Sequence, residues 1–159
     1  MFKYGVAALL LTLLSTINAA SAYVITDNRG GTIRTFELMF GALRATGEPV
    51  VIDGLCASAC TLAVSIIPKN KLCVTPRAIL AFHQAWDKGT AYVNGQPMAN
   101  MVPNKAASEY LFHSYPQPVR DWIFVHGGLP PPWRILKLRG KELRKLVRTC
   151  DAQAEVRLE

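Results

Sequence analysis

Residues 50–67 read VVIDGLCASACTLAVSII, and this segment is the most informative one about the fold. Val50-Val51-Ile52 is a short, fully apolar run, which is typical of a strand in a parallel sheet covered on both faces. Asp53-Gly54 then indicates a turn, and the small apolar residues beyond it predict a helix that Pro68 stops. A buried strand that turns directly into a helix indicates an α/β domain.

The neighbouring segments continue this alternation. Tyr23 to Ile25 is a β-prone run that ends in a turn at Gly30-Gly31. Apolar residues then recur at helical spacing from Ile33 to Leu43. Residues 72–74 and 78–82 predict two further strands, so the order is β-α-β-α-β-β and again favours an α/β fold.

The pattern weakens after His83. Residues 88–101 are rich in glycine, proline and asparagine and predict a loop. Residues 106–113 predict a helix, and Pro118 opens another short helix at its first turn. Residues 141–148 predict a last helix with one apolar and one basic face.

The first 22 residues have the composition of an export signal. Lys3 precedes an apolar run over residues 6–14, and Ala20-Ser21-Ala22 matches an A-x-A cleavage site. The run is shorter than the roughly 20 residues that a bilayer-spanning helix needs; an uncleaved membrane anchor is the alternative. We therefore expect a signal peptide over residues 1–22, a single domain over residues 23–159, and a periplasmic or secreted protein.

Composition agrees with one folded domain. The chain has 159 residues, of which 50% are hydrophobic and 18% charged, and its net charge is +7. A chain of this length can bury a sizeable core, and one this apolar does not belong to the disordered class.

The cysteines offer three interpretations. An exported chain with an even number of cysteines predicts disulfides, and four cysteines allow three pairings. The alternatives are a zinc site, which the C-x₃-C spacing fits poorly, and buried free thiols. The disulfide candidates are Cys56, Cys60, Cys73 and Cys150.

Three features together suggest acyl-transfer chemistry. Ser58 lies where a strand turns into a helix, so backbone N–H groups and a positive helix end lie beside it and would favour a nearby oxyanion. Gly30-Gly31 allows close approach of backbone N–H groups to a ligand. His83 ends a strand and could be the general base that activates the serine.

At these positions the sequence resembles the Clp protease proteolytic subunit (ClpP) family of the crotonase-like superfamily. The resemblance rests on the Gly-Gly turn in residues 28–33, the Gly-x-x-x-Ser turn in residues 51–62 and the His-Gln strand end in residues 79–84. It covers roughly residues 23–86. It implies an α/β fold of stacked β-β-α units in a minimal version.

The resemblance also implies a set of site residues. Ser58 would be the nucleophile and His83 the base, while the N–H groups of Gly31 and Ala59 would form the oxyanion hole. Asp121 is the candidate for the third member of the triad, although it follows the histidine at a shorter distance than in the family. Asp87 is the second choice for that role, and a nearby cysteine thiol is the alternative nucleophile.

Together with the predicted export signal, the resemblance implies an exported serine hydrolase, most simply a serine peptidase acting on a peptide or protein, without cofactor or metal. The segment after His83 is too short for the long helix through which the family forms rings, so a closed proteolytic chamber is not expected, although a homo-oligomer remains an alternative. An ATPase partner is not expected either, because an exported protein would meet no ATP. Two other functions stay open: an inactive ClpP-like binding or scaffolding module in the cell envelope, and a crotonase-like enzyme acting on acyl-CoA.

The last candidate feature is a basic segment. Residues 134–148 hold seven of the 18 basic residues of the chain. A solvated helix face is one interpretation, and an anionic envelope surface bound between Arg134 and Arg148 is the other. Nucleic acid is not expected, because no recognised nucleic-acid motif is present and the chain is predicted to be exported. His113 and His126 are interpreted as structural.

Overall fold

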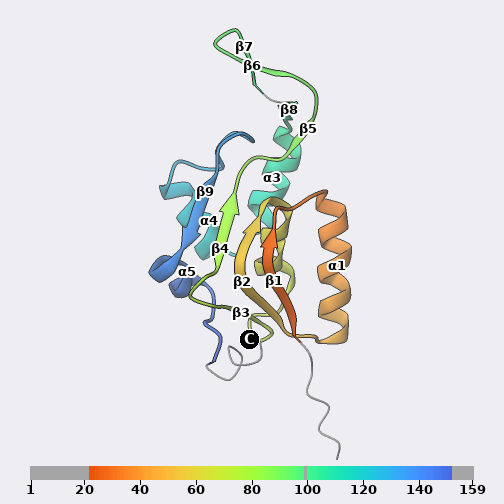
Figure 1. The fold of residues 1–159 in the computed structure, drawn as a ribbon, viewed down its shortest axis with the longest axis vertical. Helices are drawn as coiled ribbons and strands as arrows, with labels where there is room; N and C mark the ends of the chain where they lie inside the picture. The colour runs from red at the N-terminus through yellow and green to blue at the C-terminus, as the bar shows by residue number, and fades with distance from the viewer. Residues whose placement is uncertain (1–21, 99, 152–159) are drawn as a thin grey trace, which may run out of the picture.

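The computed structural model describes residues 22–98 and 100–151 and has a mixed α/β fold (Figure 1). The signal peptide predicted over residues 1–22 lies almost wholly outside the described residues. The elements, among which η1 is a 3₁₀ helix, follow one another as β1 (Tyr23–Asn28), α1 (Ile33–Thr46), β2 (Val50–Ala57), η1 (Ser58–Leu62), α2 (Ala63–Ile66), β3 (Leu72–Val74), β4 (Ile79–Phe82), β5 (Trp86–Lys88), β6 (Ala91–Val93), β7 (Gln96–Met98), β8 (Met101–Pro103), α3 (Lys105–Ser114), α4 (Gln117–Val125), β9 (Leu136–Arg139) and α5 (Gly140–Leu146).

A five-stranded sheet forms the centre of the molecule. Its strand order is β1-β2-β4-β9, and β3 pairs with the first half of β2. β1, β3 and β4 run parallel to β2, whereas β9 runs antiparallel to β4. β2 therefore has neighbours on both sides, and six of its eight residues are buried. This burial explains the unbroken apolar run that begins β2.

The register of the sheet brings two strand ends together. Ala57, the last residue of β2, pairs with Ala81 near the end of β4. Because the strands are parallel, the residues that follow each of them leave the sheet at the same edge. Ser58 and His83 are such residues. The fold therefore positions two of the three chemical features of the sequence at one edge.

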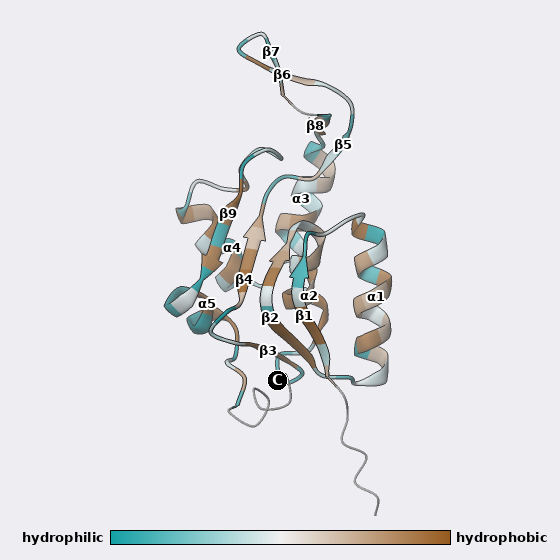
Figure 2. Ribbon diagram, in the orientation of Figure 1, coloured by the Kyte–Doolittle hydropathy of each residue, from teal (hydrophilic) through white to brown (hydrophobic). Residues whose placement is uncertain are grey.

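The core lies between the sheet and the helices packed on it. Phe40 of α1, Phe82 of β4, Ile123 of α4 and Leu138 of β9 are all at most 1% exposed. In Figure 2 the middle of the sheet is brown, whereas the outer surface of α5 is teal. In the described part of the chain, no helix is both long enough and apolar enough to span a bilayer.

Several predicted elements are confirmed. α1 begins after Thr32, whose side chain accepts a hydrogen bond from the backbone of Thr35, and it ends at Gly47 in the left-handed conformation. The helices predicted over residues 106–113 and from Pro118 correspond to α3 and α4. The predicted last helix is shorter than expected and ends at Leu146.

The helix expected after Ala57 is confirmed, although most of it is the 3₁₀ helix η1, followed by four residues of α2. Two other predictions about local structure are wrong. The turn expected at Asp53-Gly54 is absent, because both residues continue strand β2. The loop expected over residues 88–101 contains two antiparallel ribbons, β5 with β8 and β6 with β7. These ribbons form an arm, described over residues 86–98 and 100–103, which projects from the body of the molecule at the top of Figure 1.

The prediction of disulfides is confirmed, and the structure selects one pairing. Cys56 bonds to Cys60, and Cys73 bonds to Cys150. All four cysteines are thereby used, so the alternatives of a zinc site built on these cysteines and of free thiols are wrong. Disulfides of this kind are typical of proteins in an oxidising compartment.

The buried carboxylate of Asp53 joins β2 to the segment that follows β3. Asp53 of β2 accepts hydrogen bonds from the Thr75 hydroxyl at 2.5 Å and from the Arg77 guanidinium at 2.5 and 3.2 Å. The hydrogen bond from Arg77, with help from that of Thr75, holds the pKa of Asp53 below its ordinary value against the opposing effect of burial.

This ion pair makes stability dependent on pH. Because the pKa of Asp53 is lower in the folded state, its contribution is complete above the unfolded pKa of about 3.9 and is lost as pH falls through the folded value. We expect Asp53→Asn to reduce the free energy of unfolding by about 2 kcal/mol at neutral pH. Urea unfolding of both proteins at falling pH should show this difference shrink below about pH 4; a difference independent of pH would contradict it.

Candidate active site

Ser58 adopts an unusual backbone conformation at the junction of β2 and η1. Its φ angle is +55°, which places a non-glycine residue in the left-handed region. Such a conformation costs on the order of 1–3 kcal/mol and persists only where the surrounding structure imposes it. A serine on a sharp, strained turn between a strand and a helix is also the arrangement that presents nucleophiles in unrelated hydrolases.

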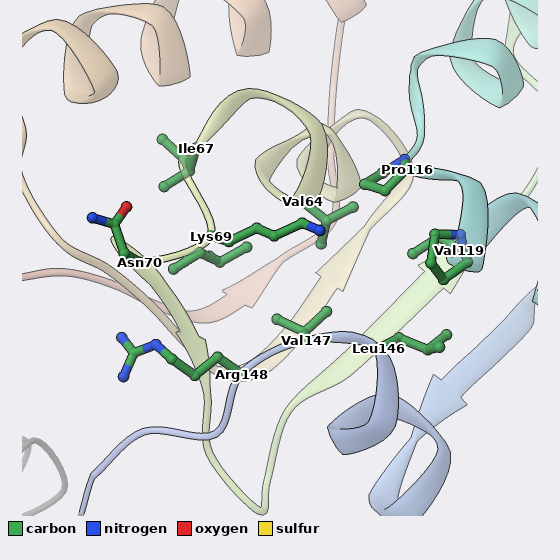
Figure 3. A pocket seen from close by; sticks show the side chains of 11 residues that line it. Val64, Ile67, Lys69, Asn70, Pro116, Val119, Leu146, Val147 and Arg148 are labelled. Atoms are coloured by element: carbon green, nitrogen blue, oxygen red, sulfur yellow. The ribbon is translucent and has the colours of Figure 1, made fainter.

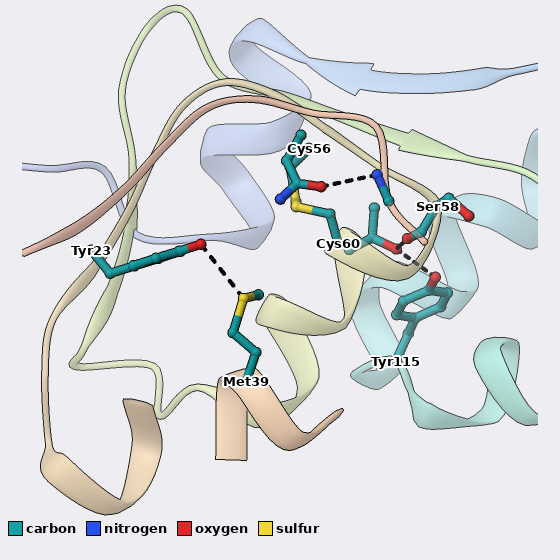
Figure 4. Close-up of a disulfide and its surroundings, with 9 residues drawn as sticks. Tyr23, Met39, Cys56, Ser58, Cys60 and Tyr115 are labelled. Atoms are coloured by element: carbon teal, nitrogen blue, oxygen red, sulfur yellow. Dashed lines mark hydrogen bonds between the residues drawn. A yellow bond between two sulfur atoms is a disulfide. The ribbon is translucent and has the colours of Figure 1, made fainter. Parts of the chain in front are cut away.

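Buried hydrogen bonds hold this turn. The Thr61 hydroxyl donates to the carbonyl oxygen of Ser58 at 2.6 Å. The same hydroxyl lies 2.6 Å from the phenol oxygen of Tyr115 (Figure 4). Because the Thr61 hydroxyl donates its only hydrogen to the Ser58 carbonyl, the Thr61 oxygen accepts a hydrogen bond from the Tyr115 hydroxyl. Burial raises the pKa of Tyr115 to about 12, so its phenol keeps the proton that it donates throughout the neutral range.

A disulfide also brackets the serine. Cys56 precedes Ser58 by two residues and Cys60 follows it by two, and both cysteines are fully buried. The bond closes within the turn itself and does not reach Cys73 or Cys150 (Figure 4). It joins the end of β2 to η1 across the serine. Oxidised in this way, neither cysteine can serve as the alternative nucleophile.

The Gly-Gly turn packs directly against the serine. A Cβ atom on Gly30 would lie 2.6 Å from the Ala57 carbonyl oxygen, 2.6 Å from the Ser58 Cβ and 3.1 Å from the Ala59 nitrogen. No side chain can be accommodated at this distance, and the φ angle of Gly30 is +86°. Asn28 shapes the turn by accepting a hydrogen bond from the Gly30 N–H at 2.9 Å.

The predicted oxyanion-hole residues, Gly31 and Ala59, directly follow Gly30 and Ser58 in the chain. Gly31 is exposed, and its N–H has no hydrogen-bond partner among the described residues. Ala59 is the second residue of η1, where N–H groups precede the first helical hydrogen bonds. The role of these two N–H groups as an oxyanion hole stays a prediction.

His83 is half-buried at the same sheet edge. Its Nδ1 atom lies 2.8 Å from the carbonyl oxygen of Gln84, and the Gln84 side chain donates to the carbonyl oxygen of Leu129 at 3.1 Å. A proton on Nδ1 would be held by the Gln84 carbonyl and would leave Nε2 as the acceptor. No hydrogen bond joins His83 to Ser58 in the part of the chain that the structure describes.

The candidate acids engage other partners. Asp121 is exposed on α4 and accepts a hydrogen bond from the Gln117 side chain at 2.5 Å. Asp87 of β5 accepts from the Asn104 side chain at 2.9 Å. Neither carboxylate bonds to His83 among the described residues. The role of Asp121 therefore stays a prediction without a contact that supports it.

The sequence analysis predicted Gly30 at this site but missed three other residues: Asn28, Thr61 and Tyr115. A signal existed for Thr61, because a hydroxyl residue three positions after Ser58 can bond back to its carbonyl. Tyr115 had no such signal, because it is 54 residues away from Thr61 and reaches it only in the folded state.

The other two histidines and the basic segment lie far from Ser58 in sequence. His113 is exposed on α3, and His126 is exposed with its Nδ1 atom 2.7 Å from the Trp122 carbonyl oxygen. The seven basic side chains of residues 134–148 are all exposed on or beside β9 and α5. No group of three metal-ligating side chains occurs within residues 22–98 and 100–151.

Comparisons with other proteins add no identification. No protein-family model matches the sequence, and a search of curated proteins found no similar chain. The interpretation of the site therefore rests on its geometry.

Proposed function

We propose that this protein is an exported serine hydrolase of ClpP-like fold, with peptides as the substrate class. The observation that carries the proposal is the backbone of Ser58, which is held at φ +55° between a strand and a helix. A buried disulfide and a buried Thr61–Tyr115 pair surround it. A serine needed only for packing would not require a positive φ angle, because a residue with negative φ would avoid the conformational free energy that this backbone costs.

The proposed reaction is acyl transfer through Ser58. His83 Nε2 takes the hydroxyl proton while Oγ attacks the carbonyl carbon of the substrate. The N–H groups of Gly31 and Ala59 stabilise the resulting oxyanion. His83 then protonates the leaving amine, and water releases the acyl group by the reverse sequence of proton transfers. The Gln84 carbonyl orients the histidine in place of a carboxylate.

The proposed location follows from the cysteines and the amino-terminal sequence. Both disulfides require an oxidising environment to form and persist. The export-like composition of residues 1–22 agrees with this requirement. We therefore place the proposed activity in the periplasm or outside the cell.

A fluorophosphonate probe tests the proposal. We expect it to label the purified, oxidised protein at Ser58 across roughly pH 6 to 9, with the adduct located by mass spectrometry. Ser58→Ala should abolish labelling. Ser65→Ala is the matched control, because Ser65 lies on α2 with a buried hydroxyl that has no partner among the described residues. Equal labelling of the wild type and the Ser58→Ala protein, or none of either, would reject the hydrolase.

A binding module is the second candidate function. The observation in its favour is that no hydrogen bond links Ser58 to His83, although hydrogen bonds of this kind are often long before substrate binds. An inactive module would keep its stability in the Ser58→Ala variant and would show no labelling at any pH. The same experiment therefore decides between the two functions.

A further inference from the structure

A cavity on another part of the molecule lies beside α2. Its volume is about 310 Å³, which is within the range of small-molecule sites. It is bounded by the end of α2, the start of β3, the turn into α4 and the chain after α5 (Figure 3). The side chains that form most of its wall are aliphatic: Val64, Ile67, Leu72, Val119, Leu146 and Val147.

The floor and the rim of this cavity differ in burial and in charge. Val64, Ile67, Leu72 and Val119 are between 1% and 8% exposed and belong to the hydrophobic core. Lys69 and Arg148, in contrast, are exposed, and no aspartate or glutamate lines the cavity. The site therefore combines an apolar interior with a cationic rim.

The rim cations are available for a ligand. In Figure 3 the Lys69 side chain extends over the cavity toward Val64. Within the described residues, no carboxylate lies within ion-pair distance of its ammonium group. Arg148 lies 3.7 Å from Asp151, but both side chains are exposed, so this pair is weak and easily exchanged.

From this arrangement we infer that the cavity binds an acyl chain whose anionic head is held by Lys69 and Arg148. The aliphatic wall favours a saturated chain over a polar ligand, because polar groups would lose their hydrogen bonds to water there. At about 30 Å³ for each heavy atom, the cavity holds roughly ten carbon atoms. The ligand is a medium-chain fatty acid or one chain of an anionic lipid. Its binding at this cavity does not depend on the proposed chemistry of Ser58.

Titration calorimetry with a series of fatty acids tests this inference. We expect affinity for the purified full chain to rise several-fold for each added methylene, and then to level off near ten carbons as the cavity fills. Dodecyltrimethylammonium, which has a cationic head on a similar chain, should bind at least fivefold more weakly than dodecanoate. Affinity that keeps rising with chain length, or equal binding of the two heads, would overturn the inference.

Variants locate the binding to this cavity. Lys69→Gln combined with Arg148→Gln should weaken dodecanoate binding about fivefold or more. Leu146→Trp, at a half-buried wall position, should weaken it at least tenfold by filling the space. Lys88→Gln is the matched control, because Lys88 is an exposed lysine on the projecting arm. Equal affinities of the double variant and this control would overturn the inference even if Leu146→Trp failed to fold.

Vesicles distinguish the two sources of the acyl chain. Binding to phosphatidylglycerol vesicles but not to phosphatidylcholine vesicles, lost in the double variant, would support the inference with a membrane lipid as the source. Binding of dodecanoate with no vesicle binding would support it with a free fatty acid as the source. Vesicle binding without any dodecanoate binding would overturn it.

Discussion

His83→Ala should slow the phosphonylation of Ser58 by roughly 1,000-fold, because the general base that removes the hydroxyl proton would be absent. Asp121→Asn should change the same rate by less than about twofold, since Asp121 bonds to Gln117 and not to His83. The measurement is the second-order rate of probe labelling under identical conditions. Circular dichroism of each variant shows whether the fold is retained.

His126→Ala is the matched control for the histidine. Its Nδ1 atom contacts a backbone carbonyl, as that of His83 does, but it lies on the exposed end of α4. We expect its labelling rate to equal that of the wild type. If Asp121→Asn were as slow as His83→Ala, a carboxylate and not the Gln84 carbonyl would orient the base, as the family resemblance implies.

Removal of the Cys73–Cys150 disulfide should have the largest effect on stability. The bond joins residues 77 positions apart, so in the chain-entropy model it removes about 4.5 kcal/mol of unfolded-state entropy. Beside this disulfide, the Cys150 N–H donates a backbone hydrogen bond of 3.1 Å to the Val74 carbonyl oxygen. We expect Cys73→Ala with Cys150→Ala to lower the free energy of unfolding, measured in urea, by about 4 kcal/mol.

The other disulfide provides the contrast. Cys56 and Cys60 are separated by four positions, and the same model assigns their bond only about 2 kcal/mol. Replacing both with alanine should leave the protein folded but slow the labelling of Ser58, because the turn would no longer be closed. If this pair proved more important for stability than Cys73–Cys150, loop length would not govern the effect of these bonds.

Local patterns predicted the elements in which each residue interacts mainly with its neighbours in sequence. Helical spacing predicted α1, and the apolar run of residues 50–52 predicted a buried strand. The arm was missed although a signal was present. Asn94 and Gly95 both have positive φ angles and connect β6 to β7, as expected for the Asn-Gly turn of a hairpin.

Pairing between distant segments determined the conformation of elements that local sequence patterns could not predict. β9 alternates apolar and basic residues, but it becomes part of the sheet only because Leu138 pairs with Leu80 of β4. Its basic side chains favoured a helix or a solvated segment in isolation. A four-residue strand has too few contacts within itself to be stable, so its partner determines its conformation.

Local sequence patterns were enough to predict the α/β class, the disulfides and the candidates Ser58 and His83. Only the folded chain shows which cysteines pair, that Gly30 contacts the serine turn, and that Tyr115 supports this turn through Thr61. The difference arises because periodicity and turn chemistry act over only a few residues. Disulfide partners and buried hydrogen bonds require atoms from distant segments to meet, and the packing of the whole sheet sets those distances.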